Sequence, residues 1–239
     1  MVRSERCLII SPHFDDAVMS CGFWIERHPG SIVATVCSGA PGPGIEAIQW
    51  DGFSGFKSGN DASVARGMED AAAVATLGAQ QLLLGFLDGD YKERVGRCHE
   101  DTSVAGPFQM ALETSIGDTV DELEPDTCLA PLGLGHEDHV VTGAAARSAL
   151  AARPDLALLN YADLPYAISY PDLLSGAVKQ LEVNGVRVAR FPTRSPAEIY
   201  LKERAVDCYV SQAEQLGASH PRWHECLLPR AETFFRIVR

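Results

Sequence analysis

CLIISPHFDD, residues 7–16, is the stretch that decides the fold of this chain. Its first four residues are all apolar instead of alternating with polar ones, which is typical of a strand buried on both faces of a parallel sheet. The stretch then turns polar, and residues 16–27 carry a helical pattern that ends at His28-Pro29-Gly30. A buried strand, a polar turn and a helix in this order predict the start of a β-α-β unit.

The same alternation continues through the first two-thirds of the 239 residues. Further strands are predicted at residues 32–36, 81–86, 127–131 and 156–161, and further helices at residues 60–77, 108–123 and 140–152. Strands that alternate with helices favour a mostly parallel sheet with helices on both faces. We therefore expect an α/β fold: a single Rossmann-like, three-layer domain over residues 1–239.

The pattern changes in the last third of the chain. Residues 181–188, LEVNGVRV, contain an Asn-Gly pair, which supplies the positive φ angles of a two-residue hairpin turn. A long helix is predicted at residues 196–216 with its proline in the first turn, and a terminal strand at residues 234–238. We therefore expect the sheet to carry a C-terminal hairpin and helix extension.

Residues 39–59 are the exception to this regularity. They are rich in glycine and proline, follow the second predicted strand, and carry Trp50, Phe53 and Phe56. Loops of this length are usually functional or disordered. The aromatic side chains favour a lid that covers the substrate.

Composition excludes several classes of protein. The net charge is −12 and no cluster of lysine and arginine exists, which argues against a nucleic acid partner. No apolar run reaches the roughly 18 residues of a membrane span, and the first residues lack the apolar region of a signal peptide. Seven cysteines are scattered without a Cys-x-x-Cys pair, which indicates reduced thiols and predicts a cytoplasmic location.

Two polar clusters follow predicted strands directly. They are His13-Phe14-Asp15-Asp16 after the first strand and His136-Glu137-Asp138-His139 after the fourth. Ligands bind outside the carboxyl ends of the strands in open α/β sheets, so residues distant in sequence can meet there. Two histidines and one carboxylate leave an open position on a divalent metal ion, as a catalytic site requires. The two clusters together predict such a site.

Each cluster also has a simpler interpretation. An Asp pair before a helix is often a cap and a favourable charge at the positive helix end, and an isolated His-x-x-His is often a surface feature. Adjacent aspartates such as Asp15 and Asp16 point to opposite sides of an extended chain, which suits one metal ligand and one residue that faces the substrate water. Because both clusters contain histidine and lie at strand ends, we favour the metal site.

These motifs resemble those of the PIG-L (LmbE-like) family of zinc-dependent de-N-acetylases. The family's first motif, Pro/Ala-His-Pro-Asp-Asp, is matched by residues 12–16 with Phe14 in place of the middle proline. Its second motif, His-Pro-Asp-His, is matched by residues 136–139 with Glu137 in place of proline. Other features that fit in order and place are Arg66 and Glu69, the sequence FLDG at residues 86–89, and Ser211-Gln212.

The resemblance implies a role for each residue of the two clusters. His13, Asp16 and His139 are implied as ligands of Zn²⁺, or of another divalent ion such as Fe²⁺. Asp15 is implied as the general base. His136 is implied to stabilise the oxyanion or to protonate the leaving amine, with Asp138 orienting it or raising its pKa.

Substrate contacts follow from the resemblance as well. Arg66 and Asp88 match positions that reach sugar hydroxyls; the alternatives are a helix ion pair for Arg66 and a turn role for Asp88. Some relatives place a carbonyl-polarising tyrosine just before the second motif, where this chain has only Leu132-Gly133-Leu134. That role is therefore absent or comes from elsewhere, such as Tyr91 or the lid. His220 and His224 are interpreted as loop residues at the rim.

The expected function is metal-dependent hydrolysis of an N-acetyl or other N-acyl group. The substrate is a small N-acylated amino sugar or glycoconjugate, for example in natural-product biosynthesis. One alternative is an amidase that acts on a thiol conjugate or another non-sugar amide. A second alternative, from a different class, is a non-catalytic metal- or glycan-binding protein.

Overall fold

The computed structural model of this chain describes residues 5–95, 106–183, 187–189, 196–228 and 231–236. Its strands are β1 (Cys7–Ser11), β2 (Ile32–Thr35), β3 (Gln80–Leu83), β4 (Thr127–Pro131), β5 (Ala157–Tyr161), β6 (Arg187–Ala189) and β7 (Phe234–Arg236). They form one sheet in the order β3-β2-β1-β4-β5-β7-β6. The strands β1 to β5 are parallel, and β7 is antiparallel to both of its neighbours.

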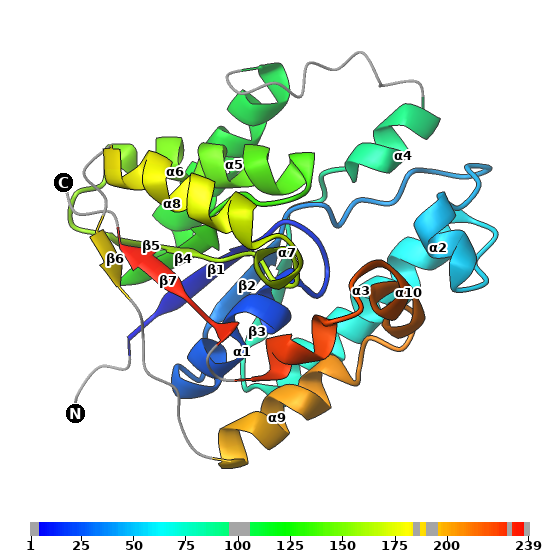
Figure 1. Ribbon diagram of the computed structural model, residues 1–239. Helices are drawn as coiled ribbons and strands as arrows, with labels where there is room; N and C mark the ends of the chain where they lie inside the picture. Colours follow the sequence, from blue (N-terminus) through cyan, green and yellow to red (C-terminus); the bar gives the residue numbers. More distant parts are fainter. Residues whose placement is uncertain (1–4, 96–105, 184–186, 190–195, 229–230, 237–239) are drawn as a thin grey trace.

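Helices lie on both faces of this sheet (Figure 1). They are α1 (Asp16–Arg27), α2 (Gln49–Phe53), α3 (Gly59–Thr76), α4 (Gly89–Arg94), α5 (Pro107–Leu123), α6 (Glu137–Ala151), α7 (Tyr166–Ser169), α8 (Pro171–Val183), α9 (Pro196–Val206) and α10 (Ala213–Ser219), with a 3-10 turn at Trp223–Leu227. Cys7 and Ile9 of β1 pack into the core cluster that contains α1, α3 and α9 side chains, whereas Leu8 and Ile10 pack with α5 and α6. This double burial explains the unbroken apolar run, and the three-layer α/β expectation is confirmed.

The strand order reverses beside β1. The chain runs from β1 outward to β2 and β3, and then returns to the other side of β1 to form β4 and β5. Such a reversal opens a crevice at the carboxyl ends of the two central strands. The residues after β1 and β4 are the two polar clusters, so the topology brings them together.

The predicted hairpin at residues 181–188 is wrong. Residues up to Val183 belong to α8, and β6 pairs with the distant β7 instead of a neighbouring strand. Leu174, Ala177, Val178 and Leu181 recur at helical spacing and pack against the core, so burial of this stripe outweighs the local turn preference. The Asn-Gly pair itself lies outside the described residues.

The predicted single helix at residues 196–216 is also wrong. The helix stops at Val206, and a second one, α10, begins only at Ala213. Between them, the hydroxyl of Tyr209 donates to Asp70 at 2.7 Å, and the backbone N–H of Ser211 donates to Glu69 at 2.9 Å. These bonds to α3 hold the intervening backbone out of the helix.

Further buried polar contacts tie the C-terminal third to α1. Lys202 of α9 is fully buried; its Nζ donates to the carbonyl of Met19 at 2.6 Å and to Glu232 at 2.7 Å. The same Glu232 carboxylate accepts from the backbone N–H of Phe23 at 2.9 Å. Because a buried charge is costly without its partner, these contacts fix the position of the last segment.

The remaining predicted elements are present with shifted ends. For example, α3 begins at Gly59 instead of residue 60, after Ser58, whose hydroxyl accepts from the backbone N–H of Asp61. The segment at residues 39–59 contains α2 and folds back through a bridge between Glu46 and Ser58. The helices α2, α4, α7 and α8 have no counterpart in the sequence prediction.

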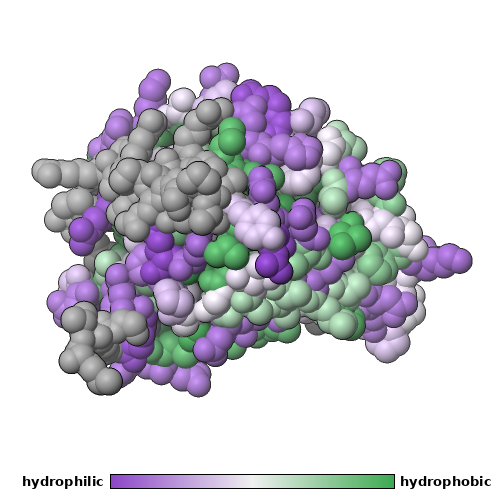
Figure 2. Space-filling view, turned by 90° about the horizontal axis from the view of Figure 1, so that it is seen from below, coloured by the Kyte–Doolittle hydropathy of each residue, from purple (hydrophilic) through white to green (hydrophobic). Residues whose placement is uncertain are grey.

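The face that lies below α9 in Figure 1 carries mainly hydrophilic side chains, between which hydrophobic side chains form separate patches (Figure 2). Within the described residues, none of the helices combines the length and the apolar character needed to cross a membrane.

Candidate metal centre and active site

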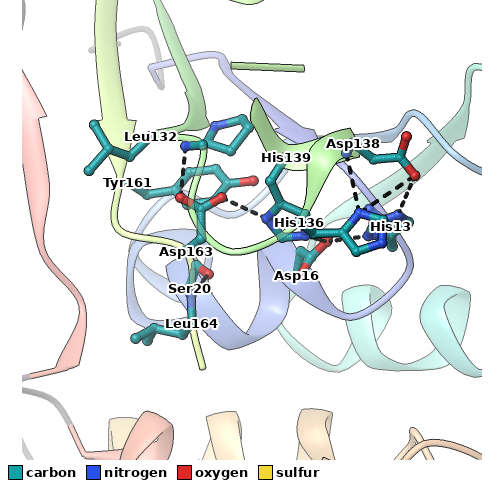
Figure 3. A network of polar contacts seen from close by, with 12 residues as sticks. His13, Asp16, Ser20, Leu132, His136, Asp138, His139, Tyr161, Asp163 and Leu164 are labelled. Carbon is teal, nitrogen blue, oxygen red and sulfur yellow. Dashed lines mark hydrogen bonds and ion pairs between the residues drawn. The ribbon is translucent and has the colours of Figure 1, made fainter. Parts of the chain in front are cut away.

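The two polar clusters meet in the crevice beside β1 and β4 (Figure 3). The ring of His13 lies 5.0 Å from that of His136 and 5.2 Å from that of His139. His13 precedes α1, whereas His136 caps the start of α6 and His139 lies in its first turn. The helix starts therefore carry residues 13–16 and 136–139 to the same point.

Three side chains offer ligand atoms to one metal ion. Asp16 Oδ2 lies 3.3 Å from His13 Nδ1 and 3.1 Å from His139 Nε2, and one donor atom from each residue lies within 4.8 Å of the others. Burial alone would lower the pKa of His139, but the carboxylates of Asp16 and Asp163 raise it to about 9. The cluster thus attracts positive charge. Two imidazole nitrogens and one carboxylate oxygen fit zinc with an open coordination position.

Each histidine of this set has a carboxylate on its other ring nitrogen. Asp163 Oδ1 lies 2.7 Å from His139 Nδ1, and its Oδ2 accepts from the backbone N–H of Gly133 at 2.9 Å. Asp138 Oδ2 lies 3.1 Å from His13 Nε2 and accepts from the backbone N–H of Gly89 at 2.9 Å. Such carboxylates fix the ring orientation and strengthen the ligand nitrogen.

Asp163 was not predicted from the sequence. It follows β5 without a motif around it, and it is fully buried. Its position at the carboxyl end of a parallel strand, beside the first and fourth strands, was the one available signal.

Asp163→Asn is expected to lower zinc affinity by about 10- to 100-fold, because the neutral amide no longer holds the His139 ring by a charged hydrogen bond. A competition titration against a zinc chelator measures this change. Asp118→Asn, on the exposed side of α5, is the matched control and should bind zinc like the wild type. Equal affinities of all three proteins would contradict the orienting role of Asp163.

Asp138 faces His13 more closely than His136. Its Oδ2 is 3.8 Å from His136 Nδ1, whereas the backbone N–H of Asp138 donates to that nitrogen at 3.2 Å. Although burial favours the neutral acid, the hydrogen bond with His13 holds the pKa of Asp138 well below its usual range. Lys92 Nζ, itself buried above the ring of Phe108, adds positive charge 3.7 Å from Asp138 Oδ1.

His136 lines the pocket as a neutral hydrogen-bond donor. Because its Nδ1 accepts from the Asp138 backbone, the neutral ring carries its proton on Nε2. Burial and the positive charge of His13 lower its pKa. This arrangement suits donation of a hydrogen bond to a developing negative charge.

Asp15 is separated from Asp16 by an unusual backbone turn. Its φ angle is +86°, a region that non-glycine residues rarely occupy and that is often found at functional sites. Its backbone N–H points to Asp70, and its side chain lines the pocket. Burial and repulsion by Asp16 raise the pKa of Asp15 to about 8, while a divalent cation beside it favours the ionised form. Asp15 is thus placed as a proton acceptor.

Arg66 and Asp88 both line the same pocket. Arg66 Nη1 also pairs with the buried Asp51 at 3.3 Å, so the ion-pair alternative is present, with a partner outside its own helix. Asp88 Oδ1 accepts from the backbone N–H of Asp90 at 2.9 Å, as a turn residue does. Tyr91 donates to Asp51 at 2.5 Å and is absent from the described lining of this pocket, so it does not supply the carbonyl-polarising tyrosine.

The pocket is lined by both polar and apolar side chains. The polar ones include five residues of the two clusters together with Arg66 and Asp88, and the apolar ones are Met19, Ile48, Trp50, Leu164, Pro165 and Leu216. Trp50 of the 39–59 segment donates its indole N–H to Gln212 at 2.5 Å, so that segment forms part of the wall. Tyr166 and His220, from the last third of the chain, complete the lining.

Another possible ligand group, His13, Cys37 and Asp138, shares a histidine with the first. Burial and the charge of Asp138 raise the pKa of the Cys37 thiol to about 12, so this cysteine is neutral beside His13. A neutral, buried thiol favours the set with Asp16 and His139.

Comparisons with known proteins agree with this geometry. A family model described as PIG-L, GlcNAc-PI de-N-acetylase, matches residues 8–150, which is more than half of the chain and includes both clusters. A curated relative, the 2′-N-acetylparomamine deacetylase of Streptomyces fradiae, is 27% identical over 177 residues; the match covers 70% of this chain but only 59% of that relative's length.

Solved structures extend the likeness over nearly the whole chain. A deacetylase of the teicoplanin biosynthetic pathway, solved as a triple mutant, has a TM-score of 0.76 at 25% identity, with 98% of each chain covered. The zinc-inhibited form of teicoplanin deacetylase Orf2 has a TM-score of 0.75 at 24% identity, again with 98% of each chain covered. The fold of residues 151–239 is therefore shared as well.

Proposed function

This chain belongs to the PIG-L family of de-N-acetylases, and from that membership we propose that it is a zinc-dependent hydrolase of N-acylated amino sugars. The reaction releases an acetyl or other acyl group as its carboxylate and leaves a free amine. The single observation that carries the proposal is the position of Asp15 and His136, which line the same pocket as His13, Asp16 and His139. A protein that only binds metal needs neither of these two side chains.

His13, Asp16 and His139 would hold the zinc ion. When bound there, zinc lowers the pKa of water and polarises an amide carbonyl. Two histidines and one carboxylate also suit Fe²⁺, which is the alternative ion. Asp138 and Asp163 keep the two imidazoles in the orientation that the metal requires.

Asp15 takes a proton from the attacking water in this proposal, and His136 donates a hydrogen bond from its Nε2 toward the amide. Asp138 acts on both histidines, since its carboxylate faces His13 and its backbone N–H faces His136. Arg66 and Asp88 are in place to bind sugar hydroxyls. The apolar side chains that line the pocket suit an acyl chain or an aglycone.

The substrate class is supported by the relatives. One of them is a deacetylase of 2′-N-acetylparomamine, and others belong to teicoplanin biosynthesis. A small N-acylated amino sugar or glycoside fits a pocket lined by both hydroxyl-binding and apolar groups.

A single domain over residues 1–239 and a cytoplasmic location belong to the same proposal. All described strands form one sheet. The cysteines of the described residues are free thiols, and all but Cys208 are buried. Free thiols are the expected state in a reducing compartment.

Amine release from a substrate panel tests the function. The zinc-loaded protein is offered N-acetylglucosamine, its p-nitrophenyl glycoside, 2′-N-acetylparomamine and an N-acetylcysteine conjugate, and free amine is detected with fluorescamine. We expect release from the sugars only, lost with a chelator and restored by zinc. Release from the cysteine conjugate alone would contradict the sugar assignment, and release from none would contradict catalysis.

A further inference from the structure

We infer that Tyr166 is a further catalytic residue, whose hydroxyl donates a hydrogen bond to the carbonyl oxygen of the scissile amide. The inference rests on the proposed function. Tyr166 opens α7 after β5, in the part of the chain that lies beyond the family model. Neither the sequence motifs nor the matched region points to it.

Tyr166 lies beside the metal ligands. Its ring stands edge-on to that of His139, with centroids 5.2 Å apart at an angle of 78°. It lines the same pocket as Asp15 and His136. Burial and the negative charge of Asp16 raise the pKa of Tyr166, so its hydroxyl keeps its proton near pH 7.

The ring is held from several sides. A Cβ atom on Gly135 would lie 2.1 Å from Cδ1 of Tyr166, so the ring occupies the space that this glycine leaves open, next to His136. The ring of His220 also packs against it edge-on at 5.2 Å, and His220 Nδ1 is bonded to the hydroxyl of Ser169 at 2.9 Å. A donor held in advance costs no reorganisation when charge develops.

The hydroxyl of Tyr166 is free to meet a substrate. Within the described parts of the chain, no group forms a hydrogen bond with this hydroxyl. It is also absent from the fully buried polar atoms without a partner, so its oxygen is not fully buried. The hydroxyl of Tyr91, by contrast, donates a hydrogen bond to Asp51. A phenol is neutral near pH 7 and donates its proton without losing it.

The chemistry places this donor at the carbonyl oxygen. As the water oxygen bonds to the carbonyl carbon, its proton passes to Asp15 and the carbonyl π electrons move onto oxygen, which becomes negative. Tyr166 stabilises that oxygen. When the C–N bond then breaks, the proton on Asp15 passes to the departing nitrogen, so the products are a carboxylic acid, which ionises in water, and an amine. His136, whose neutral ring keeps its Nε2 proton, takes the first of its two expected roles, as a second hydrogen-bond donor to the same oxygen.

Tyr166→Phe tests this assignment with two probes, N-acetylglucosamine and N-trifluoroacetylglucosamine. We expect kcat on the acetyl substrate to fall by about 100-fold, the effect of one lost oxyanion donor. KM should stay within about threefold. The loss on the trifluoroacetyl substrate should be below about 10-fold, because the fluorine atoms already polarise the carbonyl and reduce the need for the donor.

The control is Tyr170→Phe, which removes a half-exposed hydroxyl just after α7 and should leave both rates unchanged. Zinc content and melting temperature are measured for both variants. An unchanged kcat, a rise in KM alone, or equal losses with both substrates would overturn the role of Tyr166. A wild-type protein that releases amine from neither probe would refute the proposed function itself, and the role of Tyr166 with it.

Discussion

Asp15→Asn is expected to lower kcat for amine release by about 10³-fold while zinc content stays unchanged. The substitution keeps the size of the side chain but removes its capacity to accept a proton from water. Asp15 lines the pocket, whereas Asp16 faces the two imidazoles, so the metal ligands are left in place. Steady-state kinetics and elemental zinc analysis of the same preparation check both parts.

The same variant has a second expected effect, on stability without metal. Burial and Asp16 raise the pKa of Asp15 to about 8 in the folded chain, whereas an aspartate in the unfolded chain ionises at about pH 4. The free energy of unfolding of the metal-free wild type therefore falls as the pH rises from about 4 toward 8. Asparagine does not titrate, so the variant does not lose this stability. The metal-free variant should therefore melt at a higher temperature than the metal-free wild type at pH 7, and the difference should vanish below about pH 4.

Asp155→Asn, in the exposed turn before β5, is the matched control for both measurements and should behave like the wild type. If Asp15→Asn retained kcat within about threefold of the wild type, Asp15 would not be the base.

His13→Ala combined with His139→Ala is expected to abolish stoichiometric zinc binding and, with it, amine release. Only Asp16 of the three ligands remains, and one carboxylate does not hold zinc against dialysis. Elemental analysis after dialysis and the amine assay measure the two losses. Because the pKa of each histidine is raised in the folded state, the substitution also removes two groups that carry positive charge beside Asp16.

His224→Ala, an exposed histidine in the 3-10 turn, serves as the control and should keep full zinc content. Zinc that persists in the double variant would show that the ligand set is wrong. It would then direct attention to the possible group in the described residues that contains neither His13 nor His139, namely Glu5, Cys7 and His28, at the opposite end of β1.

The central fold was predictable because a strand that is buried on both faces has a continuous apolar sequence. The run at residues 7–10 is apolar throughout because its side chains enter two different core clusters. The meeting of the two polar clusters was predictable for a related reason: His13 and His139 follow strands that the topology places side by side. Local patterns and the strand-end rule were sufficient for both.

The errors lie where tertiary contacts overrule local preference. The Asn-Gly pair predicted a hairpin, but the apolar stripe of α8 packs against the core, partly buried, as a helix. The helix predicted through residue 216 is interrupted because Tyr209 and Ser211 bond to α3. Asp163 and Tyr166 escaped prediction since single residues after β5 carry no pattern, and only the folded chain brings them to His139.

Because defined contacts hold the C-terminal third against α1 and α3, the molecule consists of two parts that can evolve separately. Residues 13–16 and 136–139, with Asp163 and Tyr166, carry the chemistry, whereas Gln212, Leu216 and His220, beyond α9, shape the wall of the pocket. Recombination between related genes could exchange that wall and leave the reaction centre intact. The exchanged piece would have to keep Tyr209 and Ser211 compatible with Asp70 and Glu69 of α3. New specificities can thus arise on this scaffold by swapping a module instead of rebuilding an active site.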